Sequence, residues 1–432
     1  MKDAAGEAGS TAGDVPEETL PWEHWRKPWH YVSARIAPIE LAFKTEHEDF
    51  EVEEQLSFEP SGEGEHLFLF LEKRGRSTPD LARSLARSFQ VESKDVGWAG
   101  RKDTRGVTRQ WFSVRGAPSA DLERLEAPDC KLLRHTRNDR KLRLGALTGN
   151  RFRLLLRGIP DERRTDAESV LALVREQGLP NYFAAQRFGV SGRAPELGLL
   201  LLQGRARQYL LRRLHPDHSP LSEATGQLLE VIARGKRPEQ RKLTEWMGEL
   251  PREFAPLAAQ LARRPGDWRS ALRALDRGTL SLHLSAWQAG VFNAVLSERF
   301  AGRKQPLSGD LLQLNGSHSL FEANEAEDLR ELETRCAAFE LALTGPLPGQ
   351  RAPLATGLGG QIERNCMERA GLVAERFELP VKGLHLPGAR RALVVPVPTL
   401  QWTWEADGLR LEFALPPGAY ATTLVAELTK NP

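Results

Sequence analysis

The stretch from Trp98 to Arg115 limits the fold of this chain more than any other part of its sequence. A short apolar run ends at Ala99, and a second run, Val107 to Val114, is rich in β-branched and aromatic residues. A polar cluster bounded by glycines lies between them. This pattern predicts two strands joined by a tight turn. One carboxylate, Asp103, stands at the tip of the turn, and three cations surround it in the sequence: Arg101, Lys102 and Arg105.

A charged turn is by itself compatible with an inert, solvated loop. The distribution of charge along the rest of the chain helps to decide whether this turn belongs to a binding site. The net charge of +2 hides a strong segregation. Thr45 to Glu65 holds nine acidic residues and no Lys or Arg, whereas Lys131 to Arg157 holds nine basic residues and one acidic residue. A local basic block suits a polyanion such as nucleic acid. A solvated face of strands and loops is the alternative.

Length and composition exclude several classes of protein. With 432 residues the chain exceeds one ordinary core, which indicates two domains. No stretch approaches the roughly 20 apolar residues of a membrane span, and no secretory signal is visible. The three cysteines are far apart and match no zinc spacing, as is typical of a reducing compartment. We therefore expect a cytoplasmic protein without metal or membrane.

Periodicity predicts strands near both ends of the chain and helices between them. Alternating or continuous apolar runs predict strands over 50–58, 66–72 and 151–157 and again over 391–415. From about Gly204 the period is helical, most clearly over Ser285 to Phe300, where Ser285 and Gln288 form a candidate capping box. A closing helix is predicted over 420–430. We expect the two β-rich parts to share one sheet, with a mainly helical segment inserted between them.

Five motifs, in order along the chain, resemble the TruD family of tRNA pseudouridine synthases. The stretch Ala99 to Val114 resembles the catalytic motif of that family. The other four stretches that match are Phe43-Lys44 with Glu48 to Glu54, Arg137 to Phe152, Asn181 to Gly189, and Leu415 to Thr422 with Glu427-Leu428. The likeness covers nearly everything after about residue 31. Ala184 is a departure, because the family usually has Gly there, and Ala would be strained if the backbone needed a positive φ.

The resemblance implies an α+β fold with a curved, mixed and mostly antiparallel sheet, and an inserted, mainly helical α/β domain. The expected parts are a mobile N-terminal tail (1–30), the first part of the catalytic domain (31–205), the inserted domain (206–385) and the last part of the catalytic domain (386–432).

The resemblance also implies the chemistry, which is isomerisation of uridine 13 in the D-arm of tRNA to pseudouridine without a cofactor. Asp103 is then the catalytic carboxylate, either as a nucleophile at C1′ or as a base at C2′, and the sequence leaves both roles open. Lys44 and Lys102 are the expected cations that orient Asp103 or a phosphate. Phe183 is the expected ring beneath the flipped base, and Asn181 is expected to hold the loop or the base.

Arginines and lysines of the basic motif are the expected tRNA contacts: Arg137, Arg140, Lys141, Arg143, Arg151 and Arg153, with Arg205, Arg207, Arg212 and Arg213 at the domain junction. We expect a monomer that binds tRNA and no membrane. Two other hypotheses remain. In the first alternative, the chain is a catalytically idle tRNA-binding and folding chaperone on the same fold. In the second, it is a sheet-based interaction module without an RNA role.

Overall fold

The computed structural model describes residues 29–117, 122, 125, 129–189, 191–214, 226, 250–251, 253–302, 304–324, 328–372, 377, 379 and 381–431. The expected N-terminal tail, apart from its last two residues, lies outside the described residues. In the part described, no helix is long and apolar enough to cross a membrane.

The chain divides into two compact units. The first, called the sheet unit here, comprises Trp29–Ala184, Arg299–Gly345 and Ala392–Pro432. The second, called the helical unit, comprises Ala185–Glu298 and Pro346–Arg391. Every residue of the catalytic motif, together with Lys44, Asn181 and Phe183, falls in the sheet unit, so the candidate site can be described within this unit alone.

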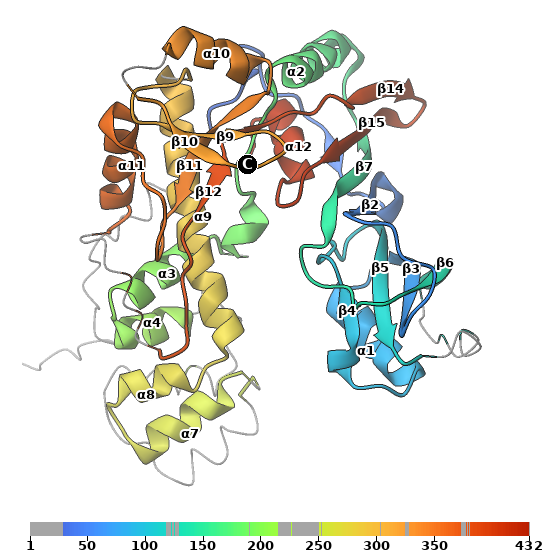
Figure 1. Ribbon diagram of the computed structural model, residues 1–432, viewed down its shortest axis with the longest axis vertical. Coiled ribbons are helices and arrows are strands. Elements are labelled where there is room, and N and C mark those ends of the chain that lie inside the picture. The colour runs from blue at the N-terminus through green and yellow to red at the C-terminus, as the bar shows by residue number, and fades with distance from the viewer. Residues whose placement is uncertain are drawn as a thin grey trace, which may run out of the picture. The chain divides into compact units, whose positions relative to one another are not determined.

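The sheet unit is built on a nine-stranded sheet with the order β14-β15-β7-β2-β5-β3-β6 (Figure 1). β1 pairs with β7, and β4 pairs with β5. All pairs are antiparallel except β2 with β5. The strands are β1 (Ala42–Phe43), β2 (Phe50–Leu56), β3 (His66–Arg74), β4 (Val96–Trp98), β5 (Val107–Arg115), β6 (Cys130–Asn138), β7 (Leu147–Arg157), β14 (Gln401–Glu405) and β15 (Gly408–Leu415).

This topology confirms the predicted α+β fold with a mixed, mostly antiparallel sheet. It also confirms that the two β-rich parts of the chain share one sheet, because β15 pairs with β7 from Leu409↔Leu156 to Leu415↔Asn150. Phe152, Leu154 and Leu156 alternate into the core, as the sequence predicts.

Three helices cover the sheet. α1 (Thr78–Ser88) begins at Ser77, whose side chain accepts a hydrogen bond from the Asp80 amide, and Pro79 stands in its first turn. Leu81 and Leu85 of α1 pack against β3, β4 and β5 (Figure 1). α2 (Arg164–Gln177) and the C-terminal α12 (Ala421–Thr429) pack together against β7 and β15. The chain therefore has separate apolar clusters under different parts of the sheet.

A second sheet contains β10 (Leu320–Glu322), β9 (Leu311–Leu314), β11 (Leu341–Leu347) and β12 (Ala389–Ala392), and β8 (Leu179–Pro180) pairs with β13 (Val394–Val395). The sequence indicated no clear strand between about 204 and 390, so β9 to β11 were missed. β9 and β10 have four and three residues, which is too short for an alternating pattern to stand out. β11 has seven, but Gly345 and Pro346 interrupt its apolar pattern.

The remaining helices are α3 (Ala194–Leu202), α4 (Ala206–Arg213), α7 (Ala255–Arg263), α8 (Trp268–Arg273), α9 (Arg277–Gly302), α10 (Leu329–Ala337) and α11 (Gly357–Arg369). Short 3₁₀ turns occur at His47–Asp49, Ser93–Asp95, Asp161–Arg163 and Ala185–Phe188. The predicted capping box at Ser285 is wrong. The helix α9 begins well before Ser285, because the buried residues Leu280 and Leu284 extend its apolar face toward the N-terminus. Ser285 therefore lies inside the helix, where its hydroxyl donates to the Leu282 carbonyl at 2.9 Å.

Candidate active site

Asp103 lies on the turn between β4 and β5, which form the predicted antiparallel hairpin with Trp98 opposite Phe112. Two buried side chains hold the backbone of this turn. The Thr78 hydroxyl accepts from the Lys102 amide at 3.0 Å and donates to the Gln110 side-chain oxygen at 2.8 Å. The Gln110 side-chain amide in turn donates to the Gly100 carbonyl at 3.2 Å. Both side chains are fully buried, so the first residue of α1 and the centre of β5 fix the position of the turn.

Lys44 lies beside Asp103, as the resemblance implied. Its Nζ is 3.3 Å from Asp103 Oδ1, and the side chains are 16% and 33% exposed. The same Nζ lies 3.7 Å from the centre of the Phe50 ring, in a cation–π contact. Lys44 has a φ of +58°, which is uncommon for a residue with a side chain and often occurs at functional sites. The carboxylate is therefore ion-paired and still accessible to a substrate.

Lys73 is a second cation at the turn, and the sequence analysis missed it. It is 1% exposed, and its Nζ donates to the Asp103 carbonyl at 3.1 Å and to the Arg76 carbonyl at 2.6 Å. Burial disfavours the ammonium and lowers the pKa of Lys73 to about 8, although the negative charge of Asp103 acts in the opposite direction. The sequence contained a signal, because Lys73 continues the buried alternation of Leu67, Leu69 and Leu71.

Asp103 or a phosphate was the expected partner of Lys102, and in the structure Lys102 pairs with Glu54 instead of Asp103. Its ammonium bonds to the Glu54 carboxylate, and the two side chains are 5% and 0% exposed. Glu54 also accepts from the Trp111 amide at 3.1 Å. Burial raises the pKa of Glu54, and the charge of Lys102 opposes that effect. A buried charge needs a partner, so Lys102 ties the turn to β2 and leaves Asp103 to Lys44.

Asn181 and Phe183 contact the C-terminal part of the chain. The Asn181 side-chain amide donates to the Ala392 carbonyl at 2.9 Å, and its backbone amide donates to the Leu393 carbonyl at 2.8 Å. Asn181 thus holds the loop after β8. The Phe183 ring meets Tyr420 edge-on at 6.0 Å and is 8% exposed. Ala184 is not among the residues with a positive φ, so alanine in place of the usual glycine causes no strain there.

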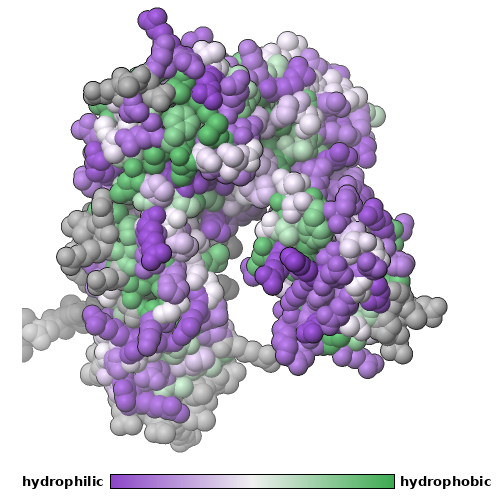
Figure 2. Space-filling view, viewed as in Figure 1, coloured by the Kyte–Doolittle hydropathy of each residue, from purple (hydrophilic) through white to green (hydrophobic). Residues whose placement is uncertain are grey.

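The predicted RNA contacts have different surroundings. The Arg137 guanidinium donates to the carbonyls of Gly64 at 3.1 Å and Ala117 at 2.9 Å, and Arg153 pairs with Glu412 at 3.3 Å. Exposed side chains include Arg140, Arg143 and Arg151. Figure 2 shows mostly hydrophilic residues over the part of the sheet unit around β3, β5 and β6.

Two of the arginines expected at the domain junction have carboxylate partners. Arg212 pairs with Glu196 and Arg213 with Glu253, each at 3.0 Å. Arg207 lies over the Trp268 ring at 5.9 Å. These partners compete with any phosphate for the guanidinium groups.

Two carboxylates of the quoted motifs hold the fold together. Asp49, fully buried, accepts from Arg157 Nη2 at 2.7 Å and from its Nε at 3.0 Å. Glu427 accepts from the Ser33 hydroxyl at 2.6 Å and from the Val32 amide at 3.1 Å. These contacts tie β7 and the segment before β1 to their neighbours. In the described part of the chain, no three His, Cys, Asp or Glu side chains group as a metal cluster requires.

Comparisons with known proteins identify the family of this chain. The family model for tRNA pseudouridine synthase D (TruD) matches residues 29–428. The tRNA pseudouridine synthase D of Geobacter metallireducens is 35% identical over 403 residues, which is 93% of this chain and 98% of that protein. The enzyme of the same description from Methylococcus capsulatus is 35% identical over 389 residues, with 89% of each chain covered.

A crystal structure assigned to the same family, from Methanosarcina mazei, superposes with a TM-score of 0.72. The match covers 97% of this chain and 99% of that chain, and its 24% identity supports the fold alone. The chain therefore belongs to the tRNA pseudouridine synthase D (TruD) family and is an isomerase, a pseudouridine synthase.

Proposed function

We propose that this enzyme converts a uridine of tRNA, at position 13 in the D-arm, to pseudouridine, and that Asp103 is its catalytic carboxylate. The observation that supports this role most is the Asp103 turn. One partly exposed carboxylate lies 3.3 Å from a lysine ammonium, on a backbone held by buried polar side chains of α1, β3 and β5. A preorganised charge of this kind is what a reaction at a sugar carbon needs.

The reaction needs a carboxylate but no net transfer of atoms. The bond between uracil N1 and C1′ breaks, the base turns, and a bond forms between C5 and C1′. A proton leaves C5 and N1 ends protonated. Asp103 acts either as a nucleophile at C1′ or as a base at C2′, and both roles require the ionised form. Lys44, whose ammonium lies 3.3 Å from Asp103 Oδ1, orients the carboxylate.

The target base must leave its stack, which costs a few kcal/mol. Stacking on an aromatic ring recovers about 1–3 kcal/mol, and we assign this role to Phe183. Because the ring is mostly buried against Tyr420, only its exposed edge or a small movement of its loop makes room for the base. Asn181 and Lys102 support the site by holding the loop after β8 and the turn, respectively.

We propose that Arg140, Lys141, Arg143, Arg151 and Arg153 contact tRNA phosphates, and that Arg137 chiefly supports the loop they belong to. Affinity that rests on phosphate contacts falls steeply with salt. We further propose that the enzyme acts as a monomer in the cytoplasm.

Tritium release from tRNA transcripts carrying 5-³H-uridine tests the reaction, because the C5 proton is lost. The wild type should release tritium, Asp103→Asn should release none, and a transcript with cytidine at position 13 should release none. Filter binding should give Asp103→Asn the wild-type affinity. Turnover by Asp103→Asn would refute the catalytic assignment. Binding without release by the wild type would instead favour an idle tRNA chaperone on the same fold.

A further inference from the structure

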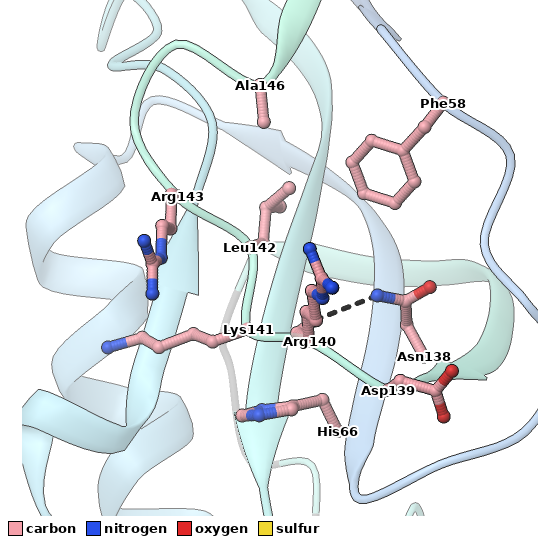
Figure 3. A pocket seen from close by; sticks show the side chains of 9 residues that line it. All are labelled: Phe58, His66, Asn138, Asp139, Arg140, Lys141, Leu142, Arg143 and Ala146. Carbon is pink, nitrogen blue, oxygen red and sulfur yellow. Dashed lines mark hydrogen bonds between the residues drawn. The ribbon is translucent and has the colours of Figure 1, made fainter.

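A depression of about 760 Å³ lies beside the hairpin that carries Asp103, within the sheet unit. Its lining combines an aromatic ring, Phe58, with cations of the loop after β6 (Figure 3). The residues that line it are Phe58, His66, Asn138, Asp139, Arg140, Lys141, Leu142, Arg143 and Ala146.

The loop that carries these cations is held in place by buried polar groups. The Asn138 side chain, 9% exposed, donates to the Arg140 carbonyl at 2.9 Å and accepts from the Ser61 amide at 3.1 Å. The Leu142 amide donates to the buried Ser113 hydroxyl of β5 at 3.0 Å. The backbone on both sides of Lys141 is therefore fixed, which presents the cations at defined positions.

Two of the cations are available for a ligand. Arg140 and Arg143 are exposed and form no ion pair with any residue that the structure describes. Lys141, by contrast, bonds to the Lys94 carbonyl. Figure 3 shows the Arg140 guanidinium turned toward the space beside the Phe58 ring, and the Asp139 carboxylate turned away from it. The depression thus has an excess of positive charge.

Phe58 offers a ring to a planar ligand. It is 37% exposed and meets the buried Phe68 edge-on at 6.2 Å. His66 adds a buried imidazole whose pKa is lowered, mainly because burial disfavours the charged form. At neutral pH the histidine therefore contributes hydrogen bonding rather than charge. A ring next to guanidinium groups is the chemistry that binds an unstacked nucleotide.

The same loop touches the catalytic hairpin. The Gly145 amide donates to the Ala99 carbonyl at 2.8 Å, immediately before the turn, and Leu142 is bonded to β5 as described above. A ligand in the depression therefore lies on the same hairpin as Asp103.

We propose that this depression binds a second, unstacked nucleotide of the substrate RNA, in addition to the target uridine, with its base on Phe58 and flanking phosphates on Arg140 and Arg143. The proposal rests on the proposed function for the presence of RNA. It predicts that the Phe58 ring and the two arginines contribute independently to RNA affinity. The contribution of the ring should be insensitive to salt, and that of the arginines should fall as salt rises.

Fluorescence anisotropy with labelled hexauridylate and full-length protein tests this, at several salt concentrations. Phe58→Leu keeps an apolar side chain and should weaken binding about ten-fold without changing the salt slope, because stacking involves no counterions. R140A/R143A should reduce the slope of log K against log salt by about 1.4, the value for two phosphates of a single strand. R35A/R330A removes the same charge at exposed sites elsewhere in the sheet unit and should change neither.

Turnover of tRNA separates this proposal from the proposed function. Phe58→Leu should raise the tRNA concentration for half-maximal tritium release about ten-fold and leave the maximal single-turnover rate unchanged. Wild-type hexauridylate affinity in Phe58→Leu, or an unchanged salt slope in R140A/R143A, overturns the subsite even when the wild type makes pseudouridine. If the binding results hold and the wild type makes none, the subsite stands and the proposed reaction falls.

Discussion

The variant Lys73→Met tests whether Lys73 fixes the position of the Asp103 turn or only contributes to the stability of the fold. A pKa lowered from 10.5 to about 8 means that protonated Lys73 costs about 3 kcal/mol more in the protein than in water. Its ammonium also makes two hydrogen bonds to buried carbonyls, each contributing about 1.5–3 kcal/mol. Methionine removes the cost and the bonds together. The two bonds together contribute about 3–6 kcal/mol, so the free energy of unfolding should fall by no more than about 3 kcal/mol.

The rate should respond far more strongly. Without Lys73 the carbonyl of Asp103 loses its donor and the turn can shift, and a displacement of about 1 Å costs on the order of 100-fold in rate. Single-turnover tritium release at saturating tRNA should fall by about that factor, while tRNA affinity stays within a few-fold. Lys131→Met, an exposed lysine on the neighbouring strand β6, is the matched control and should react at the wild-type rate.

The pH dependence gives an independent check. Below pH 8 Lys73 is protonated in both the folded and unfolded protein, so its burial cost is fully present. Between about 8 and 10.5 only the unfolded chain keeps the proton, and the wild type should gain stability relative to Lys73→Met. Over the same range the Lys73 ammonium that bonds to the Asp103 carbonyl is lost, so the rate advantage of the wild type over Lys73→Met should shrink. A variant with the wild-type rate and the wild-type pH profile would refute this role of Lys73.

Three further changes test the framework around the site. Glu54→Gln leaves the buried Lys102 ammonium without its carboxylate and should lower the free energy of unfolding in urea by about 3–5 kcal/mol. The double variant E54L/K102M should recover part of that loss. Equal losses in the two variants would contradict the pairing of Glu54 with Lys102. Arg157→Met should lower the free energy of unfolding at pH 7, measured the same way, because it leaves the buried Asp49 carboxylate without its guanidinium partner. The pKa of Asp49 is lowered because hydrogen bonds and the charge of Arg157 outweigh burial, which by itself raises it, so this contribution is present above the ordinary value of 3.8 and should vanish as pH falls through the lower folded-state pKa. Gly106→Ala places a Cβ 2.6 Å from the Phe50 carbonyl oxygen at a φ of +153° and should cost about 1–3 kcal/mol. Gly116→Ala shares the strain of a positive φ, +66°, but its Cβ would meet no atom within 4 Å. Gly106→Ala should therefore cost more, and equal losses would show that the close approach to Phe50 is relieved.

The elements that the sequence predicted well are those with a local cause. The Asp103 hairpin, the Ser77 cap of α1 and the alternation of β7 depend on neighbouring residues and on one buried face. The partners within the site have no such local cause. Lys102 and Asp103 are adjacent in sequence, yet the fully buried Glu54 of β2 takes the ammonium of Lys102, which proximity along the chain cannot indicate.

Buried charges at alternating positions were the signal that sequence analysis passed over. Glu54 follows Phe50 and Val52 on the buried face of β2, and Lys73 follows Leu71 on that of β3. A charge at a core position is costly unless it is paired, so each predicts a partner of opposite charge or a set of hydrogen bonds inside the protein. The identity of that partner depends on strand order, which the alternation alone does not determine.

Strand order also determines which residues of the acidic and basic segments form ion pairs with each other. The acidic strand β2 lies between β7 and β5, so Asp49 and Glu51 neutralise arginines of both neighbours: Arg157, Arg153 and Arg109. Two of the nine basic residues of Lys131 to Arg157, namely Arg153 and Arg157, are therefore paired with carboxylates at β2. The edge strand β6 and the loop after it keep their charge exposed, as at Arg134, which is 61% exposed. We infer that RNA meets the sheet unit chiefly at this edge, where Arg140→Ala should reduce the salt slope of tRNA binding more than Arg153→Ala does.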